Sequence, residues 1–381
     1  MSDIGEFKVL VNDGRARVGE LTTAHGVVRT PTFVPCATHG SLRGVDLRAT
    51  KVDLLLSNIY HLYLRPGIET IESLGGLHKF MGYEKPIITD SGGFQAFALP
   101  KYVKFTPDGI EFRSHLDGSL HQFTPELVVE IEQRIGVDIG TCLDVCTGFP
   151  ATEQEVGRAV SQTTEWAKRS IDAWTNKNML LYGMVQGSIY QNLRERAVRE
   201  LSALPFSGFA IGGNMYTFGE TISELEAEKP KMWEVVAFTT SILPAEKPRH
   251  LLGVGEPKDL IEGARAGVDT FDCVMATRIA RHGHVWVRTN ESSWDFDRID
   301  LQRAKFTRDT QPLDPLCDCT TCTGSFQRGY LRHLLKANDP LVLSLLSVHN
   351  VRTLTKLMES IRSAILDHRF EEEFPQRQNA N

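Results

Sequence analysis

The sequence predicts an α/β fold, a (β/α)8 barrel of the TIM type. Eight short apolar or β-branched runs, each ending in a small or polar residue, recur along the chain, and helical patterns separate several of them. Continuous apolar runs are typical of parallel strands that are buried on both faces. A doubly wound open sheet gives a similar pattern and is the alternative. The runs are residues 32–40, 54–61, 86–93, 138–146, 180–187, 208–213, 249–255 and 268–274.

The segments between these runs supply the other expected elements. The clearest helix spans residues 152–174, where Glu155 follows Thr152 at the spacing of a capping box. Residues 94–122 interrupt the strand–helix rhythm with alternating residues around two Asp-Gly pairs, which predicts a β-hairpin region inserted after the third strand. A further helix is expected over residues 325–338.

Length and composition fit a soluble globular protein. The chain has 381 residues, of which 41% are apolar and 24% charged, and this excludes a disordered or fibrous chain. Its 42 basic and 48 acidic side chains give a net charge of −6, which disfavours a generic nucleic-acid coat protein. The sequence has neither a long apolar run nor the basic-then-apolar layout of a signal peptide. We therefore expect a cytoplasmic protein that does not contact membranes.

The cysteine spacing predicts a metal site. Cys317, Cys319 and Cys322 fall within six residues, and His349 follows after a gap of 26 residues. Three thiolates on one turn and a histidine from a following helix make a closed tetrahedral Cys3His zinc site with no open position for substrate. We expect one structural Zn²⁺ per subunit, which pins a helical appendage to the barrel. The alternative is three unrelated buried thiols and a surface histidine.

Two carboxylates end predicted strands. Asp90 lies at the predicted strand end within the third run and Asp272 at the one within the eighth, and the carboxyl ends of barrel strands meet at one mouth. Displacement at the anomeric carbon of a sugar requires such a pair, because one carboxylate attacks C1′ while the other handles the proton of the leaving group. The alternative for each aspartate is a helix cap or a turn residue.

A third group of strand-end residues suits a purine base. Asp144 accepts two hydrogen bonds, Gln186 offers a donor and an acceptor, and the backbone N–H groups of Gly212 and Gly213 can meet an exocyclic oxygen. Together these groups match the Watson–Crick edge of a guanine-like base that is flipped into a pocket. Hydrogen bonding within the core and turn formation are the alternative.

The C-terminal third carries a local positive charge. Residues 278–336 hold ten Lys or Arg and seven acidic residues, so the segment has a charge of +3 in a chain of −6. A phosphate-binding face is one interpretation of this segment, and a solvated surface of mixed charge is the other.

At these residues the sequence resembles the tRNA-guanine transglycosylases, also called queuine tRNA-ribosyltransferases. The resemblance extends from about residue 7 to residue 370 and includes the Cys3His spacing. The other matching motifs are IITDSGGFQ (87–95), MVQGS (184–188), FAIGG (209–213), HLLGVG (250–255), FDCVMATR (271–278) and ARHG (280–283).

The resemblance implies a zinc-containing barrel with pentosyltransferase activity in queuosine biosynthesis. Such an enzyme exchanges guanine at the wobble position of tRNAs with GUN anticodons for a 7-deazaguanine, in bacteria usually preQ1, without ATP. By motif, Asp272 is the nucleophile that forms a covalent ribosyl link, and Asp90 is the general acid/base. The family also implies a homodimer.

The resemblance assigns binding roles to further residues. The residues implied to bind the base are Asp144, Gln186 and Gly213, which read its edge, Phe94 and Leu252, which sandwich it, and Cys146, which is typical of the bacterial pocket. The residues implied to contact the RNA are Arg278, Arg281, Gly253, Val254 and Gly255.

The chain departs from the bacterial pattern near the pocket. Val145 replaces an acidic residue, and the loop at residues 214–220 is longer and more aromatic, so the sequence leaves the incoming 7-deazaguanine open. His250 and Ala276 occupy positions where Tyr and Pro are frequent. The alternative functions are a retaining glycoside hydrolase on the same barrel and a non-catalytic RNA-binding subunit. Exchange on DNA instead of tRNA is a further variant.

These features divide the chain into three expected parts. Residues 1–275 form the barrel, with its N-terminal strands and the insertion at 94–122. Residues 276–350 form the RNA-contacting and zinc-binding subdomain. Residues 351–381 form a C-terminal helix that closes on the barrel, followed by a disordered tail.

Overall fold

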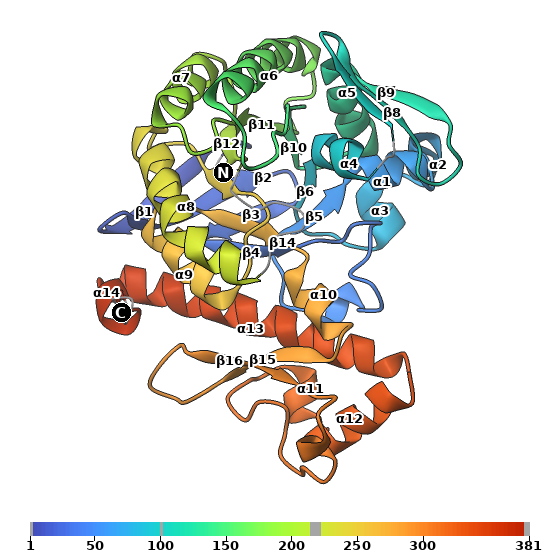
Figure 1. Cartoon of the computed structure of the whole chain (residues 1–381), viewed down its shortest axis with the longest axis vertical. Helices are drawn as coiled ribbons and strands as arrows, with labels where there is room; N and C mark the ends of the chain where they lie inside the picture. Colours follow the sequence, from blue (N-terminus) through green and yellow to red (C-terminus); the bar gives the residue numbers. More distant parts are fainter. Residues whose placement is uncertain (1–2, 100–101, 214–221, 377–381) are drawn as a thin grey trace.

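Eight parallel strands form the centre of the molecule in the computed structural model, which describes residues 3–99, 102–213 and 222–376 (Figure 1). Their order in the sheet is β4-β14-β13-β12-β11-β10-β6-β5. Each strand lies within one of the eight predicted apolar runs, so the expected α/β architecture is confirmed. The strands are β4 (Thr32–Pro35), β5 (Leu55–Asn58), β6 (Ile87–Asp90), β10 (Ile139–Thr141), β11 (Leu180–Val185), β12 (Gly208–Ile211), β13 (Arg249–Leu251) and β14 (Thr270–Cys273).

The first and last strands of this sheet approach each other and nearly close the barrel. Just beyond β4, Cys36 forms a parallel bridge with Leu56 of β5. The backbone N–H of Ala37 donates to the Leu56 carbonyl at 2.6 Å, and the Ser57 hydroxyl donates to the Ala37 carbonyl at 3.2 Å. These contacts favour the barrel over an open sheet.

Helices surround the barrel in the order that the alternating pattern predicts (Figure 1). The side chain of Thr152 accepts from the Glu155 N–H, and the side chain of Glu155 accepts from the Thr152 N–H. The predicted capping box therefore starts α6. The helices of this layer are α1 (Ile59–Leu64), α2 (Ile68–Ser73), α3 (Leu77–Met81), α5 (Pro125–Ile135), α6 (Glu153–Ala173), α7 (Gln191–Ser202), α8 (Ile222–Ile242) and α9 (Pro257–Arg265), with a 3-10 turn, η1, at Leu47–Ala49.

An antiparallel sheet covers the amino ends of the barrel strands. It consists of β1 (Phe7–Asp13), β2 (Ala16–Thr23) and β3 (Gly26–Thr30). At the turn between β2 and β3, the His25 N–H donates to Asp138, the residue immediately before β10, at 3.0 Å. A cluster of buried side chains fills the space between this sheet and the barrel, which leaves the carboxyl ends of the strands for chemistry. The cluster includes Phe7, Leu21, Val28, Val34, Leu56, Ile88 and Ile139.

The insertion after β6 is larger than the expected hairpin. It starts with a short helix, α4 (Gly93–Ala98), because Gly92 turns the chain out of β6 with a positive φ of 74°. Three antiparallel strands follow, β7 (Val103–Thr106), β8 (Gly109–Arg113) and β9 (Leu120–Phe123). The expectation of β structure was therefore right for residues 103–123 and wrong for the helical residues 94–98.

The C-terminal region forms an appendage joined to the barrel by one long helix, α13 (Leu341–Leu366) (Figure 1). On the barrel side Arg362 donates to the Pro31 carbonyl at 2.7 Å, and on the appendage side Asn350 donates to the His284 carbonyl at 3.1 Å. None of the described helices is long and apolar enough to cross a membrane. The other elements are α10 (Met275–Ala280), β15 (His284–Arg288), β16 (Phe296–Asp300), η2 (Ala304–Phe306), α11 (Thr320–Thr323), α12 (Arg328–Lys336) and α14 (Phe370–Glu373).

Candidate active site

Asp90 and Asp272 lie at the carboxyl ends of β6 and β14, where the sequence pattern predicts them. They are close enough to interact electrostatically. Burial and the negative charge of Asp272 raise the pKa of Asp90 to about 7, although three hydrogen bonds oppose the shift. A carboxyl group with a pKa near neutrality can both give and take a proton at physiological pH.

Three donors orient Asp90. Asn58, the last residue of β5, donates its amide N–H to Oδ2 at 2.5 Å. Gln95 donates to the same oxygen at 3.1 Å, and the Ile59 N–H donates to Oδ1 at 3.3 Å. Sequence reasoning missed Asn58 and Gln95, although both lie in or next to the predicted strand-end segments.

Asp272 is held mainly through one oxygen. The Gly253 N–H donates to Oδ1 at 3.1 Å, and His250 Nε2 lies 3.2 Å from the same atom. The thiol of Cys36 donates to Oδ2 at 3.6 Å. Burial and the nearby Asp272 raise the pKa of Cys36 well above its usual value, so this sulfur remains a thiol.

Asp144 and Gln186, two of the residues that the resemblance implies bind the base, are in direct contact. Gln186 Nε2 donates to Asp144 Oδ2 at 2.5 Å, and the Cys146 thiol donates to the same oxygen at 3.6 Å. Ser91 donates to Oδ1 at 3.5 Å. Burial raises the pKa of Asp144 to about 6, despite the hydrogen bonds that lower it, so the group is mostly an ionised acceptor at neutral pH.

The two glycines after β12 provide room for Gln186. A Cβ on Gly212 would lie 2.7 Å from Gln186 Nε2, and one on Gly213 would lie 2.5 Å from Gln186 Oε1. Gly213 also has a positive φ of 64°. Leu252 packs beside this turn, since its Cδ1 is 3.7 Å from the Cβ position of Gly212. Phe94, the other residue expected to sandwich a base, is 45% exposed on α4.

A buried arginine fixes this part of the pocket. Arg194 of α7 is fully buried and donates to three backbone carbonyls, those of Ser188 at 2.9 Å, Val185 at 3.0 Å and Gly213 at 3.2 Å. Burial lowers the pKa of Arg194 to about 9. The sequence signal for this role is weak, because an arginine on an amphipathic helix is usually solvated.

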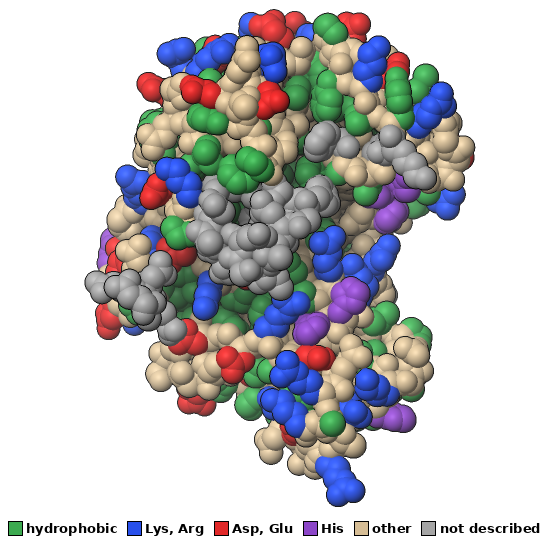
Figure 2. Space-filling model, in the orientation of Figure 1, with side chains coloured by type: hydrophobic (Ala, Val, Ile, Leu, Met, Phe, Trp, Pro, Cys, Tyr) green, Lys and Arg blue, Asp and Glu red, His purple; other side chains and the backbone are tan. Residues whose placement is uncertain are grey.

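The predicted RNA contacts divide into exposed and buried groups. Arg278 of α10 is exposed, and burial together with the positive charges of Arg43 and Arg278 lowers the pKa of the partly buried Arg281. Figure 2 shows Lys, Arg and His side chains gathered over α10 and the adjoining C-terminal appendage. Val254 is buried, and a Cβ on Gly255 would lie 2.3 Å from the Cβ of Cys273. Val254 and Gly255 are thus buried with their backbone, and of the three predicted contacts in this turn Gly253 is the exposed one.

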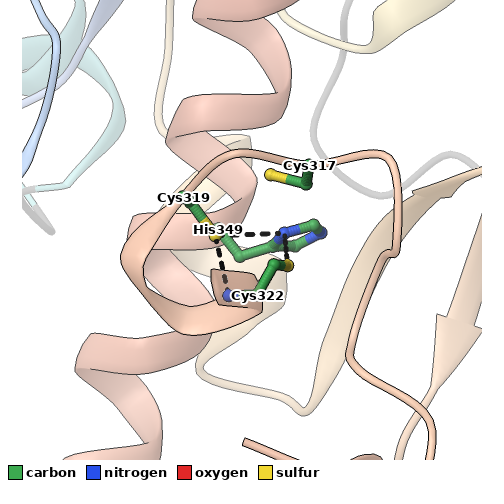
Figure 3. A group of neighbouring side chains, drawn as sticks. All are labelled: Cys317, Cys319, Cys322 and His349. Atoms are coloured by element: carbon green, nitrogen blue, oxygen red, sulfur yellow. Dashed lines mark hydrogen bonds between the residues drawn. The ribbon is translucent and has the colours of Figure 1, made fainter. Parts of the chain in front are cut away.

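Cys317, Cys319, Cys322 and His349 converge as predicted, from the turn around α11 and from α13 (Figure 3). His349 Nδ1 lies 3.7 Å from the sulfur of Cys319 and 3.4 Å from that of Cys322. Ligands at the usual Zn–S and Zn–N distances of a tetrahedral site are separated by about 3.5 Å, so the four groups fit a metal ion of this kind.

The surroundings of the cluster orient its ligands. His349 Nε2 donates to the Trp286 carbonyl at 2.7 Å, which leaves the Nδ1 lone pair directed at the thiols. Arg352 holds Asp318, the residue between the first two cysteines, through contacts of 2.6 and 2.9 Å. The cysteine turn is thus fastened to α13 by an ion pair as well as by the cluster.

Two histidines and an aspartate form a second group at the amino ends of the barrel strands, opposite the mouth that holds Asp90 and Asp272. The rings of His25 and His78 are stacked with centroids 3.6 Å apart, and both contact Asp138, at 3.0 and 3.1 Å. Burial raises the pKa of Asp138, but the hydrogen bonds from His78, the Ile87 N–H and His25 outweigh it and bring the pKa to about 2. The stacked histidine rings and their hydrogen bonds to Asp138 thus join the N-terminal sheet to the barrel.

Comparisons with known proteins show the family to which the chain is similar. A family model described as "Queuine tRNA-ribosyltransferase" matches residues 13–381. The chain is 44% identical over 377 residues to a queuine tRNA-ribosyltransferase of Oleidesulfovibrio alaskensis, covering 98% of this chain and 96% of that protein. It is 45% identical over 380 residues to one of Caldanaerobacter subterraneus, covering 97% and 96%. It is 43% identical over 374 residues to one of Dictyoglomus turgidum, covering 96% and 92%.

Proposed function

Because the chain belongs to the queuine tRNA-ribosyltransferase family, we propose that its barrel mouth exchanges guanine for a 7-deazaguanine at the wobble position of GUN-anticodon tRNAs, as a step of queuosine biosynthesis. The activity is that of a pentosyltransferase. The observation that supports the proposal most is the pair Asp90 and Asp272, with the pKa of Asp90 raised to about 7. This pair favours catalysis over the role of a non-catalytic RNA-binding subunit, and the family favours base exchange over sugar hydrolysis.

In the first half-reaction Asp272 attacks C1′ of the wobble ribose. The C1′–N9 bond breaks, its electron pair leaves with guanine, and protonated Asp90 supplies the proton that the departing base takes up. The product is a ribosyl ester of Asp272. The raised pKa of Asp90, about 7, supports this division, because that carboxyl group is the one poised to hold a proton.

In the second half-reaction the incoming base replaces the ester. Ionised Asp90 accepts a proton from the base, whose nitrogen attacks C1′, and the C1′–oxygen bond breaks with its electron pair returning to Asp272. Two inversions give net retention at C1′. The ester conserves the energy of the glycosidic bond, so the exchange needs no ATP.

Asp144, Gln186 and Gly213 are the groups that we propose read the base. Ionised Asp144 accepts from the N–H edge of a guanine-like ring, and the Gly213 N–H donates to its exocyclic oxygen. Phe94 and Leu252 cover the two faces, and stacking on an aromatic ring contributes about 1–3 kcal/mol. Cys146 supports the orientation of Asp144 through its 3.6 Å contact.

Arg278 and Arg281 are proposed to meet the RNA beside the exchanged nucleotide, with a backbone contact from the exposed Gly253, in the turn that continues into the buried Val254 and Gly255. A basic surface next to the mouth supports this assignment (Figure 2). We propose preQ1 as the incoming base, although the loop 214–220 that bears on this choice lies outside the described residues. A homodimer and a cytoplasmic location follow from the family resemblance and are part of the same proposal.

We further propose that Cys317, Cys319, Cys322 and His349 hold one structural Zn²⁺. Bound there, zinc links the cysteine turn to α13 and supplies folding energy to the appendage. The site lies away from Asp90 and Asp272, so these carboxylates carry the chemistry without it.

The proposal is tested by trapping the adduct. Wild-type protein incubated with unmodified GUN-anticodon tRNA should give a covalent complex that survives denaturant, and Asp272→Asn should give none. Competition among guanine, preQ1 and queuine then identifies the incoming base, and a DNA hairpin of the same sequence tests exchange on DNA. A stable adduct with the Asp272→Asn variant would contradict the role of Asp272.

A further inference from the structure

His250 lies fully buried beneath the candidate nucleophile. It is paired in register with Thr270 on the neighbouring parallel strand, β14. Alternate residues of a strand face the same side, so Thr270 and Asp272 both point into the barrel. His250 contacts both of them, with Nδ1 at 2.8 Å from Thr270 Oγ1 and Nε2 at 3.2 Å from Asp272 Oδ1.

The two contacts determine which ring nitrogen carries the proton. If Nε2 were unprotonated, its lone pair would face the ionised carboxylate of Asp272, and two acceptors at 3.2 Å repel each other. The favoured tautomer therefore has Nε2–H directed at Asp272, while the Thr270 hydroxyl donates to Nδ1. Nε2 makes no well-aligned hydrogen bond within the described part of the chain, so its 3.2 Å contact with Asp272 Oδ1 is an electrostatic one.

The two oxygens of Asp272 have different surroundings. Oδ1 faces His250 Nε2 and also accepts from the Gly253 N–H at 3.1 Å. Oδ2 faces the thiol of Cys36 at 3.6 Å, and a thiol is a weak donor. Oδ1 accepts from the Gly253 N–H and faces a second N–H group, so its lone pairs are less available and it is the poorer nucleophile of the pair.

From this asymmetry we infer that His250 is a positioning residue that holds Oδ1 of Asp272 and directs Oδ2 at C1′. The inference rests on the proposed function of Asp272 as nucleophile. Oδ2 forms the bond to C1′ as the C1′–N9 bond breaks. Oδ1 then becomes the carbonyl oxygen of the ester, still facing the same two donors.

The same contacts assist the second half-reaction. When the incoming base attacks C1′, the bond between C1′ and Oδ2 breaks, and negative charge returns to the carboxylate. The N–H groups of His250 and Gly253 stabilise that charge at Oδ1. No proton moves to or from His250 in either step.

A matched pair of variants tests this role. His250→Gln keeps an N–H donor near the position of Nε2, whereas His250→Met has a similar length and no donor. Single-turnover formation of the tRNA adduct should slow roughly 10- to 100-fold in the Met variant, the range expected for loss of a hydrogen bond to a charged group. The Gln variant should recover most of the rate. The KM for tRNA should be unchanged in both, because His250 acts below the nucleophile.

Variants of Thr270 test the role of His250 independently. Thr270→Val removes the hydroxyl that donates to Nδ1 without touching Asp272, and Thr270→Ser keeps it. The Val variant should slow adduct formation and the Ser variant should not. In the His250→Met background, Thr270→Val should have no further effect, since the two residues act through one contact.

The outcomes separate this inference from the proposed function. If wild-type protein forms no adduct, the nucleophile assignment fails. If wild-type protein forms the adduct and the Gln and Met variants form it at equal rates, only the role of His250 is overturned. Slow rates in both variants with lowered melting temperatures would show a packing role instead, and would also overturn it.

Discussion

The amide of Asn58 points its nitrogen at Asp90 because its oxygen is already engaged. Asn58 Oδ1 accepts from the His61 N–H at 3.1 Å and so caps α1, which leaves Nδ2 to donate to Asp90 Oδ2. One residue therefore starts a helix and lowers the pKa of the candidate acid/base, against the larger effects of burial and Asp272. An amide, unlike a carboxylate, can perform both tasks.

Replacing Asn58 with Asp should move the pH dependence of the reaction. The cap remains, but a second negative charge next to Asp90 raises the pKa of that group further above 7, by about 1 unit or more. The limb of the kcat/KM profile that reports Asp90 should shift to higher pH by that amount. Asn58→Ser keeps a cap without the added charge and should shift it less. An unchanged pH profile in the Asn58→Asp variant would show that this limb does not report the ionisation of Asp90.

Asp90 should cost the protein stability at neutral pH. Its pKa is raised from 3.8 to about 7 by burial and by Asp272, so the folded state binds the proton more tightly than the unfolded state. The contribution of protonated Asp90 to the free energy of unfolding is therefore complete below about pH 4 and is lost as the pH rises through 7. Asp90→Asn should abolish exchange yet raise the melting temperature at pH 8 more than at pH 5. Equal shifts at the two pH values would contradict the raised pKa.

Gly213→Ala should impair base recognition more than folding. The new Cβ would lie 2.5 Å from Gln186 Oε1, and the alanine would also occupy a positive φ of 64°. Gly14→Ala is a matched control, because Gly14 has a φ of 62° and open space around its Cβ position. Both variants should lose about 1–2 kcal/mol from the strained backbone. Only Gly213→Ala should raise the KM for guanine, measured by incorporation of labelled base.

Removal of the metal should loosen the appendage before the barrel. Chelation or Cys319→Ser leaves thiols and His349 without their shared ion, and the turn around α11 keeps only the Arg352–Asp318 ion pair as a link to α13. We expect about one zinc per chain in the wild type, none in Cys319→Ser, and faster hydrogen exchange first in residues 317–323. Cys142→Ala alters a buried thiol outside the cluster and should keep the zinc. Retention of zinc by Cys319→Ser would exclude the assigned ligand set.

Part of this structure is predictable because the signals are local. Each barrel strand is a short apolar run, Thr152 and Glu155 sit at the spacing of a capping box, and the three cysteines lie within six residues. Asp90 and Asp272 are recognisable because each lies at the carboxyl end of the strand that such a run predicts.

The remaining features depend on contacts between distant segments. The partnership of Asn58 with Asp90 joins residues 32 positions apart, and that of His250 with Thr270 depends on the register of two parallel strands. Arg194 resembles a solvated helix residue until three carbonyls are seen around its guanidinium. The helical start of the insertion depends on the turn at Gly92, which apolar alternation does not report.

The N-terminal sheet has a consequence for the order of events. In the part of the chain that the structure describes, side chains such as Phe7 and Val28 fill the amino end of the barrel. The base must therefore both enter and leave through the mouth at the carboxyl ends of the strands. Outgoing guanine and its replacement must then use the same passage in turn. In the proposed mechanism the ribose stays bound to Asp272 during this exchange, so a barrel with a single opening requires a covalent intermediate that persists until the new base has entered.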